Sequence, residues 1–176
     1  FNKNHKGIRS YSVSGRVVSP GVKVAPAGIP VKKLINDYCG GILPGHKLKA
    51  FFPGGASGGI FPAKMSNMGL DFGIFEPHGG FVGSHAVVIL SDHDSILDAV
   101  INTIKFFKHE SCGQGTPCRN GTEKLISLLS KSNKDVEMYE DLMVVMRDSS
   151  ICGLGQASTN CLNHLLKYFP EELNGT

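Results

Sequence analysis

The sequence has no tryptophan, no apolar run long enough to span a membrane and no large excess of charge of either sign. A membrane-spanning helix needs about 20 consecutive apolar residues, so we expect no direct membrane insertion. The 18 basic and 15 acidic residues give a net charge of +3, which argues against nucleic acid as a partner. There is no signal-peptide pattern. Because the chain begins at Phe1 rather than methionine, we expect a piece of a longer protein, cut or processed upstream.

Cysteine is also scarce, since the chain has only five. That number is too small and too unevenly spaced for a disulfide scaffold, and it indicates a reducing compartment. Cys39 ends an apolar helical pattern and is expected to be a small buried side chain. Cys112, Cys118 and Cys152 instead lie in turns rich in glycine or proline, where sulfur can face a metal.

Residues 1–93 carry β-type patterns separated by glycine and proline. Strands are expected at 11–18, 22–24, 48–52 and 86–90. Residues 31–38 have helical spacing and are followed by Gly40 and Gly41, which favour a helix end. The order of hairpin, short helix and further strands predicts a small mixed β domain of the β-grasp type, with one helix packed on the sheet.

Residues 94–176 change to a helical period. Four helices are expected, beginning near 95, 116, 135 and 158. Asp94 or Ser95 can cap the first, and Thr116 with Pro117 can open the second. The prediction is therefore an α+β chain with a β-grasp domain at 1–93 and a four-helix domain at 94–176.

The segment Ser111–Arg119 suggests an iron–sulfur site with one ligand missing. Cys112 and Cys118 stand where the outer cysteines of a C-x-x-C-x-x-C series would stand, and Gly115 occupies the middle place. Such a series and one distant cysteine can hold a four-iron cluster. Cys152, in the later turn before Gly153, is the candidate distant ligand.

The expected position of Cys118 in the first turn of a helix favours such a site. Unpaired N–H groups and the helix dipole there stabilise thiolate and the negative charge of a cluster. Three alternatives stay open at this point. The cysteines can be ordinary free thiols, they can bind zinc, or His109 can be recruited as a further ligand.

Several segments resemble one family. Glu110–Gly121 is similar to the E-S-C-G-x-C-T-P-C-R-x-G signature of the NADH-binding flavoprotein subunit of respiratory complex I. The related proteins are the diaphorase subunits of NAD-reducing hydrogenases and the β subunits of NAD-linked formate dehydrogenases. Further similar segments, which extend the resemblance over nearly the whole chain, are 11–15, 20–21, 54–59, 150–155 and 166–172.

The resemblance implies that Cys112, Cys118 and Cys152 are three of four ligands of a 4Fe–4S cluster. Gly115 stands where the remaining cysteine belongs and has no side chain to donate. The outcomes are a three-iron cluster, a four-iron cluster with water or a foreign ligand, or no cluster. Cys161 can substitute if it faces inward; otherwise it is a core thiol.

The resemblance also implies that FMN and NAD bind to an upstream domain outside this chain. The glycines at 54–59 lack the G-x-G-x-x-G order of a dinucleotide site, so a β-grasp loop is expected there. The function expected is electron transfer between FMN and further clusters. The chain would be the C-terminal part of an NAD-dependent oxidoreductase subunit, without catalytic residues and not catalytic alone.

The partners implied are other subunits of the complex, in the cytoplasm or at the cytoplasmic or matrix face of an energy-transducing membrane. Whether the parent is complex I, formate dehydrogenase or hydrogenase stays open. The alternative function is a metal-free module that docks onto another subunit.

Overall fold

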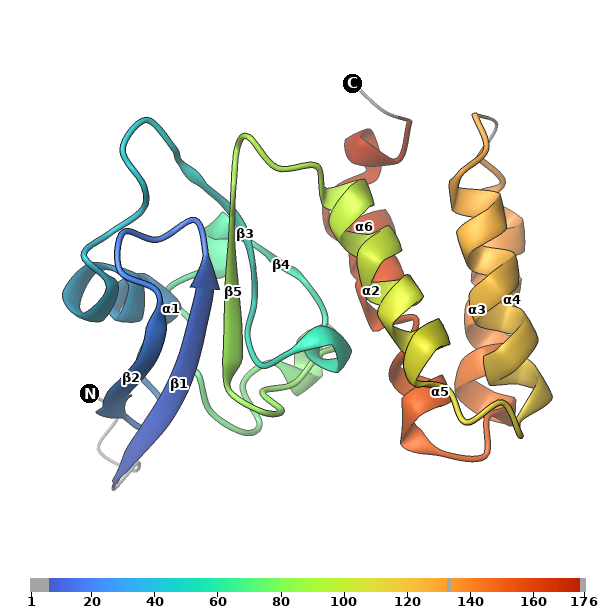
Figure 1. The fold of residues 1–176 in the computed structure, drawn as a ribbon, viewed down its shortest axis with the longest axis horizontal. Coiled ribbons are helices and arrows are strands. Elements are labelled where there is room, and N and C mark those ends of the chain that lie inside the picture. The colour runs from blue at the N-terminus through green and yellow to red at the C-terminus, as the bar shows by residue number, and fades with distance from the viewer. Residues whose placement is uncertain (1–6, 133, 175–176) are drawn as a thin grey trace. The chain divides into compact units, whose positions relative to one another are not determined.

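A computed structural model describes residues 7–132 and 134–174 of the chain. These residues form two units, and the division falls between Asp94 and Ser95. The first unit is built on a sheet and the second is helical (Figure 1). The assignment of a β-grasp domain to 1–93 and of a helical iron–sulfur domain to 94–176 stays a prediction.

The first unit contains a five-stranded mixed sheet in the order β2-β1-β5-β3-β4. β1 pairs in parallel with β5, and the other neighbouring strands are antiparallel. The strands are β1 (Ile8–Gly15), β2 (Gly21–Pro26), β3 (Leu48–Phe52), β4 (Phe61–Pro62) and β5 (Ala86–Ser91). The sheet and the single helical segment between β2 and β3 agree with the expected mixed β architecture.

Two strands differ from the expectation. The strand expected at 11–18 begins at Ile8 and ends at Gly15. Gly15 has a φ of +89°, and a Cβ there would overlap the Ile89 carbonyl oxygen. The chain therefore leaves the extended conformation at this glycine. The sequence does not predict β4, because two residues carry no alternating pattern.

The expected helix at 31–38 forms, but in two parts. α1 covers Val31–Lys33, and a π-helical turn continues over Leu34–Tyr38. Val31, Leu34 and Ile35 are buried, as helical spacing requires. Cys39, directly after this turn, is fully buried, and burial raises the pKa of its thiol.

The glycine-rich segment at 54–59 is a loop held tightly against residues 81–83. A Cβ on Gly54 would lie 2.5 Å from the Gly83 nitrogen, and one on Gly58 would overlap the Phe81 carbonyl oxygen. These glycines are needed because two backbone segments approach closely. That packing explains the glycines without a bound phosphate.

The helical unit contains the four expected helices. They are α2 (Ile96–Glu110), α3 (Thr116–Leu129), α4 (Val136–Ser149) and α6 (Asn160–Tyr168). The sequence does not predict a short helix, α5 (Gly153–Ala157), or a 3-10 turn at Pro170–Asn174. No helix within the described residues is both long and apolar enough to cross a membrane.

Side-chain caps set the starts of α2 and α4. The Ser95 hydroxyl accepts a hydrogen bond from the Asp98 N–H, and the Asp135 carboxylate accepts one from the Met138 N–H. For α3 the prediction is slightly wrong, because the N-cap is Gly115 and Thr116 is already the first helical residue. Cys118 is consequently the third residue of α3.

Candidate metal centre

Two loops of the helical unit meet at the start of α3. One, residues 111–115, joins α2 to α3, and the other, residues 150–152, joins α4 to α5. Figure 1 shows both at the same end of the helical unit. A Cβ on Gly155 would lie 3.0 Å from the Cys118 Cβ and would overlap the Ser150 Oγ. The missing side chain at Gly155 therefore lets α5 pack directly against the first turn of α3.

The contact between these loops encloses a cavity of about 130 Å³. A water molecule occupies about 30 Å³ in the liquid, so the cavity has room for several atoms. Cys118 is buried, with 7% of its surface exposed, whereas Cys112 and Cys152 are exposed. The residues that line the cavity are Glu110, Ser111, Cys112, Gly115, Cys118, Ser150, Ile151, Cys152 and Leu154.

The loop before α3 directs a hydroxyl group at one of the sulfurs. The Ser111 Oγ lies 3.3 Å from the Cys118 Sγ and accepts a hydrogen bond of 3.2 Å from the Gly113 N–H. Because Ser111 accepts from Gly113, its own proton is available to the sulfur. The Arg119 guanidinium donates to the Gly113 carbonyl oxygen and so braces the same loop.

Gly115 has a backbone conformation that any residue can adopt, with φ −78° and ψ 116°. A Cβ there would meet Ile151 at 3.5 Å from Cγ1 and 3.9 Å from Cδ1. Both are ordinary van der Waals distances. Ile151 is 71% exposed, so its side chain can move. The position beside the three cysteines therefore accommodates a side chain that the sequence does not supply.

Ser150 brings an unused polar atom to the cavity. Its side chain is 7% exposed, and within the described part of the chain the hydroxyl oxygen has no hydrogen-bond partner. A buried hydroxyl without a partner is unfavourable by about 1–3 kcal/mol. A polar occupant of the cavity would give the Ser150 hydroxyl a hydrogen-bond partner and remove this cost.

The other candidate ligands lie away from this cavity. Cys161 is fully buried in α6, and His109 is exposed near the end of α2. Neither is among the described residues that line the cavity. The full burial of Cys161 fits a role as a core thiol. Because His109 does not line the cavity, it has no role as a ligand there.

The spacing of the thiols bears on the zinc alternative. Zn–S bonds of about 2.3 Å place the sulfurs of a tetrahedral site roughly 3.8 Å apart. Across residues 7–132 and 134–174, one group of three His, Cys, Asp or Glu side chains has its ligand atoms within 4.8 Å of one another, and it contains no cysteine. At least two of the three cysteine sulfurs are therefore more than 4.8 Å apart, which is wider than the sulfur spacing in a tetrahedral zinc site.

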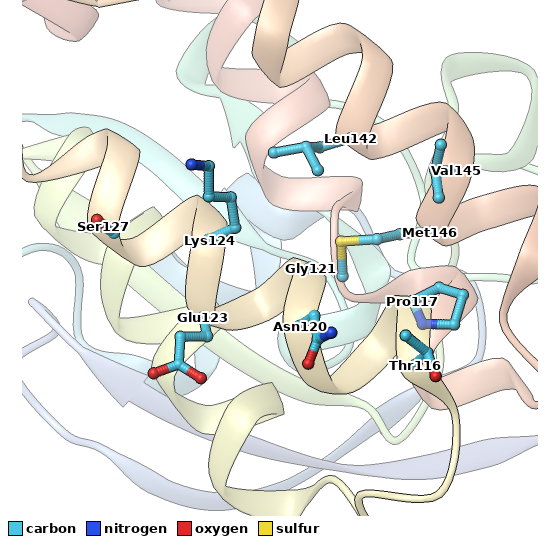
Figure 2. A pocket seen from close by; sticks show the side chains of 10 residues that line it. All are labelled: Thr116, Pro117, Asn120, Gly121, Glu123, Lys124, Ser127, Leu142, Val145 and Met146. Atoms are coloured by element: carbon cyan, nitrogen blue, oxygen red, sulfur yellow. The ribbon is translucent and has the colours of Figure 1, made fainter.

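A second, larger cavity of about 680 Å³ lies between α3 and α4 (Figure 2). Leu142, Val145 and Met146 of α4 line it opposite residues 116–127 of α3. The Met146 sulfur would lie only 2.5 Å from a Cβ on Gly121, so the two helices approach closely at this point. Val145 is 49% exposed, which leaves an apolar surface open to solvent.

Comparison with known proteins finds a family model that matches most of the helical unit. Residues 98–175 match the family model described as the NADH-ubiquinone oxidoreductase-F iron-sulfur binding region. That match contains all three cysteines that line the cavity, as well as Gly115.

Whole-chain similarity extends to both units. An F subunit of the NADH-quinone oxidoreductase of Rhizobium meliloti is 34% identical over 172 residues, which is 94% of this chain and 41% of the relative. The F subunit of the Streptomyces coelicolor enzyme is 35% identical, over 94% of this chain and 38% of the relative. This chain thus spans about two fifths of the length of these curated relatives.

A solved structure is similar to nearly the whole of this chain. The crystal structure of an NAD+-reducing NiFe-hydrogenase in the H2-reduced state matches with a TM-score of 0.83 and 26% sequence identity. The match covers 96% of this chain and 29% of that chain.

Proposed function

We propose that this chain carries electrons through an iron–sulfur cluster held by Cys112, Cys118 and Cys152. The chain is a homologue of the F subunits of NADH-quinone oxidoreductases and of a chain of an NAD+-reducing NiFe-hydrogenase. The observation that carries the proposal is the convergence of these cysteines, from the loop before α3, the first turn of α3 and the loop before α5, on one cavity inside the matched family region.

The residues around the cavity fit such a cofactor. Thiolates are the usual ligands of iron–sulfur clusters, and three cysteines line one cavity. The partnerless Ser150 hydroxyl and the space beside Gly115 are further features that an occupant would use. When bound, the cluster would supply one-electron transfer. The Ser111 hydroxyl would tune its potential through the hydrogen bond to Cys118.

We further propose that the site lacks one protein ligand, at Gly115. Glycine cannot donate to iron, and the nearest spare cysteine in the sequence of this unit, Cys161, does not line the cavity. A three-iron cluster, or a four-iron cluster with water or another small molecule as the fourth ligand, satisfies this arrangement.

The sheet unit is proposed to be a β-grasp domain. The order β2-β1-β5-β3-β4, the parallel central pair and the helical turn between β2 and β3 support this. Sites for FMN and NAD would lie in the part of such a subunit that these 176 residues do not span. The partners would be other subunits of an NAD-linked oxidoreductase, at the cytoplasmic or matrix side of an energy-transducing membrane.

One observation favours a second candidate function, docking onto another subunit without a metal. The cavity between α3 and α4 is largely apolar, and the half-exposed Val145 is one of the residues that line it (Figure 2). Cluster binding predicts that the chain retains iron through its cysteines, whereas metal-free docking predicts that it does not.

The experiment is anaerobic reconstitution of the chain with iron and sulfide, followed by assay of both and by visible absorption. The wild type is expected to retain iron and sulfide and to lose its visible absorption on reduction. Cys112→Ala, Cys118→Ala and Cys152→Ala should each retain much less. Cys39→Ala and Cys161→Ala remove buried thiols that do not line the cavity and should retain wild-type amounts. Equal retention in all five variants would refute the assignment and leave the docking function.

A further inference from the structure

A second group of ligating side chains lies in the sheet unit, separate from the cysteine cavity. His46, Asp92 and His93 each offer one ligand atom, and these atoms lie within 4.8 Å of one another. Asp92 and His93 are exposed and His46 is half-buried. The proposed electron transfer uses none of these residues.

The antiparallel pairing of β3 and β5 brings the three side chains together. Leu48 at the start of β3 is opposite Ser91 at the end of β5. His46 precedes Leu48 by two residues, and Asp92 and His93 follow Ser91 directly. The register therefore places the loop before β3 beside the turn after β5.

Backbone hydrogen bonds fix this juxtaposition. The Asp92 N–H donates to the Lys47 carbonyl oxygen at 3.0 Å, and the Lys47 N–H donates to the Asp92 Oδ1 at 2.8 Å. The second bond occupies one oxygen of the Asp92 carboxylate. Its other oxygen is then available as a ligand.

The buried Ser91 hydroxyl orients the His46 ring. The Ser91 Oγ lies 2.9 Å from the His46 Nδ1 and 3.1 Å from the Asp94 Oδ2. Arg16 donates hydrogen bonds to both oxygens of the Asp94 carboxylate, and a carboxylate can only accept. Ser91 therefore donates to Asp94 and accepts from the Nδ1–H of His46. This tautomer leaves a lone pair on the His46 Nε2, the arrangement that supporting hydrogen bonds give to metal-binding histidines.

We propose that His46, Asp92 and His93 bind one divalent transition-metal ion, Zn²⁺ in the first place. Two imidazoles and one carboxylate are a common zinc donor set, and three protein ligands leave a position for water. Mg²⁺ and Ca²⁺ are disfavoured because they prefer oxygen ligands.

The geometry needs only a small adjustment. In a tetrahedral site with bonds of about 2.0 Å, ligand atoms lie about 3.3 Å apart. The observed upper limit is 4.8 Å, so rotations that move side-chain atoms by ~1.5 Å or less close the site. The rings of His46 and His93 are already 4.2 Å apart between centroids.

The experiment measures Zn²⁺ binding to the whole chain by equilibrium dialysis. The variants are His93→Ala and Asp92→Asn, and the control is His109→Ala, which removes an exposed histidine of the helical unit. All four proteins keep the cysteines, so any zinc bound there is the same in each and does not affect the difference in bound zinc between them. His93→Ala should bind one equivalent fewer than wild type and control. Asp92→Asn keeps an oxygen for the Lys47 N–H and should bind the same equivalent at least ~10-fold more weakly.

A site-resolved measurement supplements the dialysis. Zn²⁺ should shift the imidazole nitrogen resonances of His46 and His93 in the wild type and leave those of His109 in place. The proposal fails if wild type and His93→Ala bind equal amounts of zinc, or if the resonances of His46 and His93 do not respond.

Discussion

Gly115→Cys is the change that most directly probes the missing ligand. The new Cβ would lie 3.5 Å from the Ile151 Cγ1 at an ordinary φ of −78°, so no overlap has to be relieved. Replacing a glycine at a compatible position restricts the unfolded chain and stabilises by about 0.4–1 kcal/mol. Losing glycine at an N-cap costs about 0.5–1 kcal/mol. The two effects nearly cancel, so the metal-free variant should unfold within ~0.5 kcal/mol of wild type.

The added thiol should instead increase the amount of iron that the chain binds. After anaerobic reconstitution, Gly115→Cys should hold about four irons per chain, against about three or a labile fourth in the wild type. Gly115→Ala is the matched control, because it adds the same Cβ without sulfur. Urea denaturation of the metal-free proteins checks the stability, and iron and sulfide assays check the stoichiometry. If Gly115→Cys retains no more iron than Gly115→Ala, the reasoning about a ligand gap is wrong.

Three further predictions concern packing, pH and potential. Gly155→Ala forces a Cβ to within 3.0 Å of the Cys118 Cβ and should lower the free energy of unfolding by about 1–3 kcal/mol, measured in urea. The Arg16 guanidinium lowers the pKa of Asp94 from 3.8 to about 2, so the native state binds fewer protons than the unfolded state; this stabilisation is present above about pH 4 and is lost as the pH falls towards 2. In Asp94→Asn, urea midpoints should therefore depend less on pH over that range, and an unchanged dependence would contradict the ion-pair argument. Ser111→Ala removes a hydrogen bond to sulfur and should make the reduction potential of the reconstituted protein more negative in a redox titration; an unchanged potential would exclude a tuning role.

Local patterns predicted most of the fold. Helical spacing and capping residues such as Ser95 and Asp135 place the starts of the four long helices to within about two residues. The errors occur where tertiary contacts decide. β1 ends at Gly15 because the backbone passes close to Ile89, and α5 is too short to show a period. No pattern in one segment reports such contacts.

Part of the candidate site is predictable from the sequence, and part of it depends on tertiary contacts. Residue types and spacing single out Cys112, Cys118 and Cys152, because thiols in glycine-rich turns are recognisable in a sequence. The role of Gly155 in bringing α5 against Cys118 and the partnerless hydroxyl of Ser150 depend on packing between helices. Sequence spacing cannot supply these contacts.

The group in the sheet unit was missed for a related reason. His46 and His93 are 47 positions apart in the chain, and only the register of β3 against β5 brings them together. The turn Ser91–Asp94 carries two acidic residues and a histidine and is the one signal in the sequence that draws attention to this place.

The central claim is that the thiols of Cys112, Cys118 and Cys152 hold one iron–sulfur cluster. Iron K-edge X-ray absorption of the anaerobically reconstituted chain tests it most directly. The account predicts a first shell dominated by sulfur and a second shell of neighbouring iron, with both lost when Cys112, Cys118 and Cys152 are all replaced by alanine. A first shell of nitrogen and oxygen without neighbouring iron, or a spectrum unchanged in the triple variant, would contradict it.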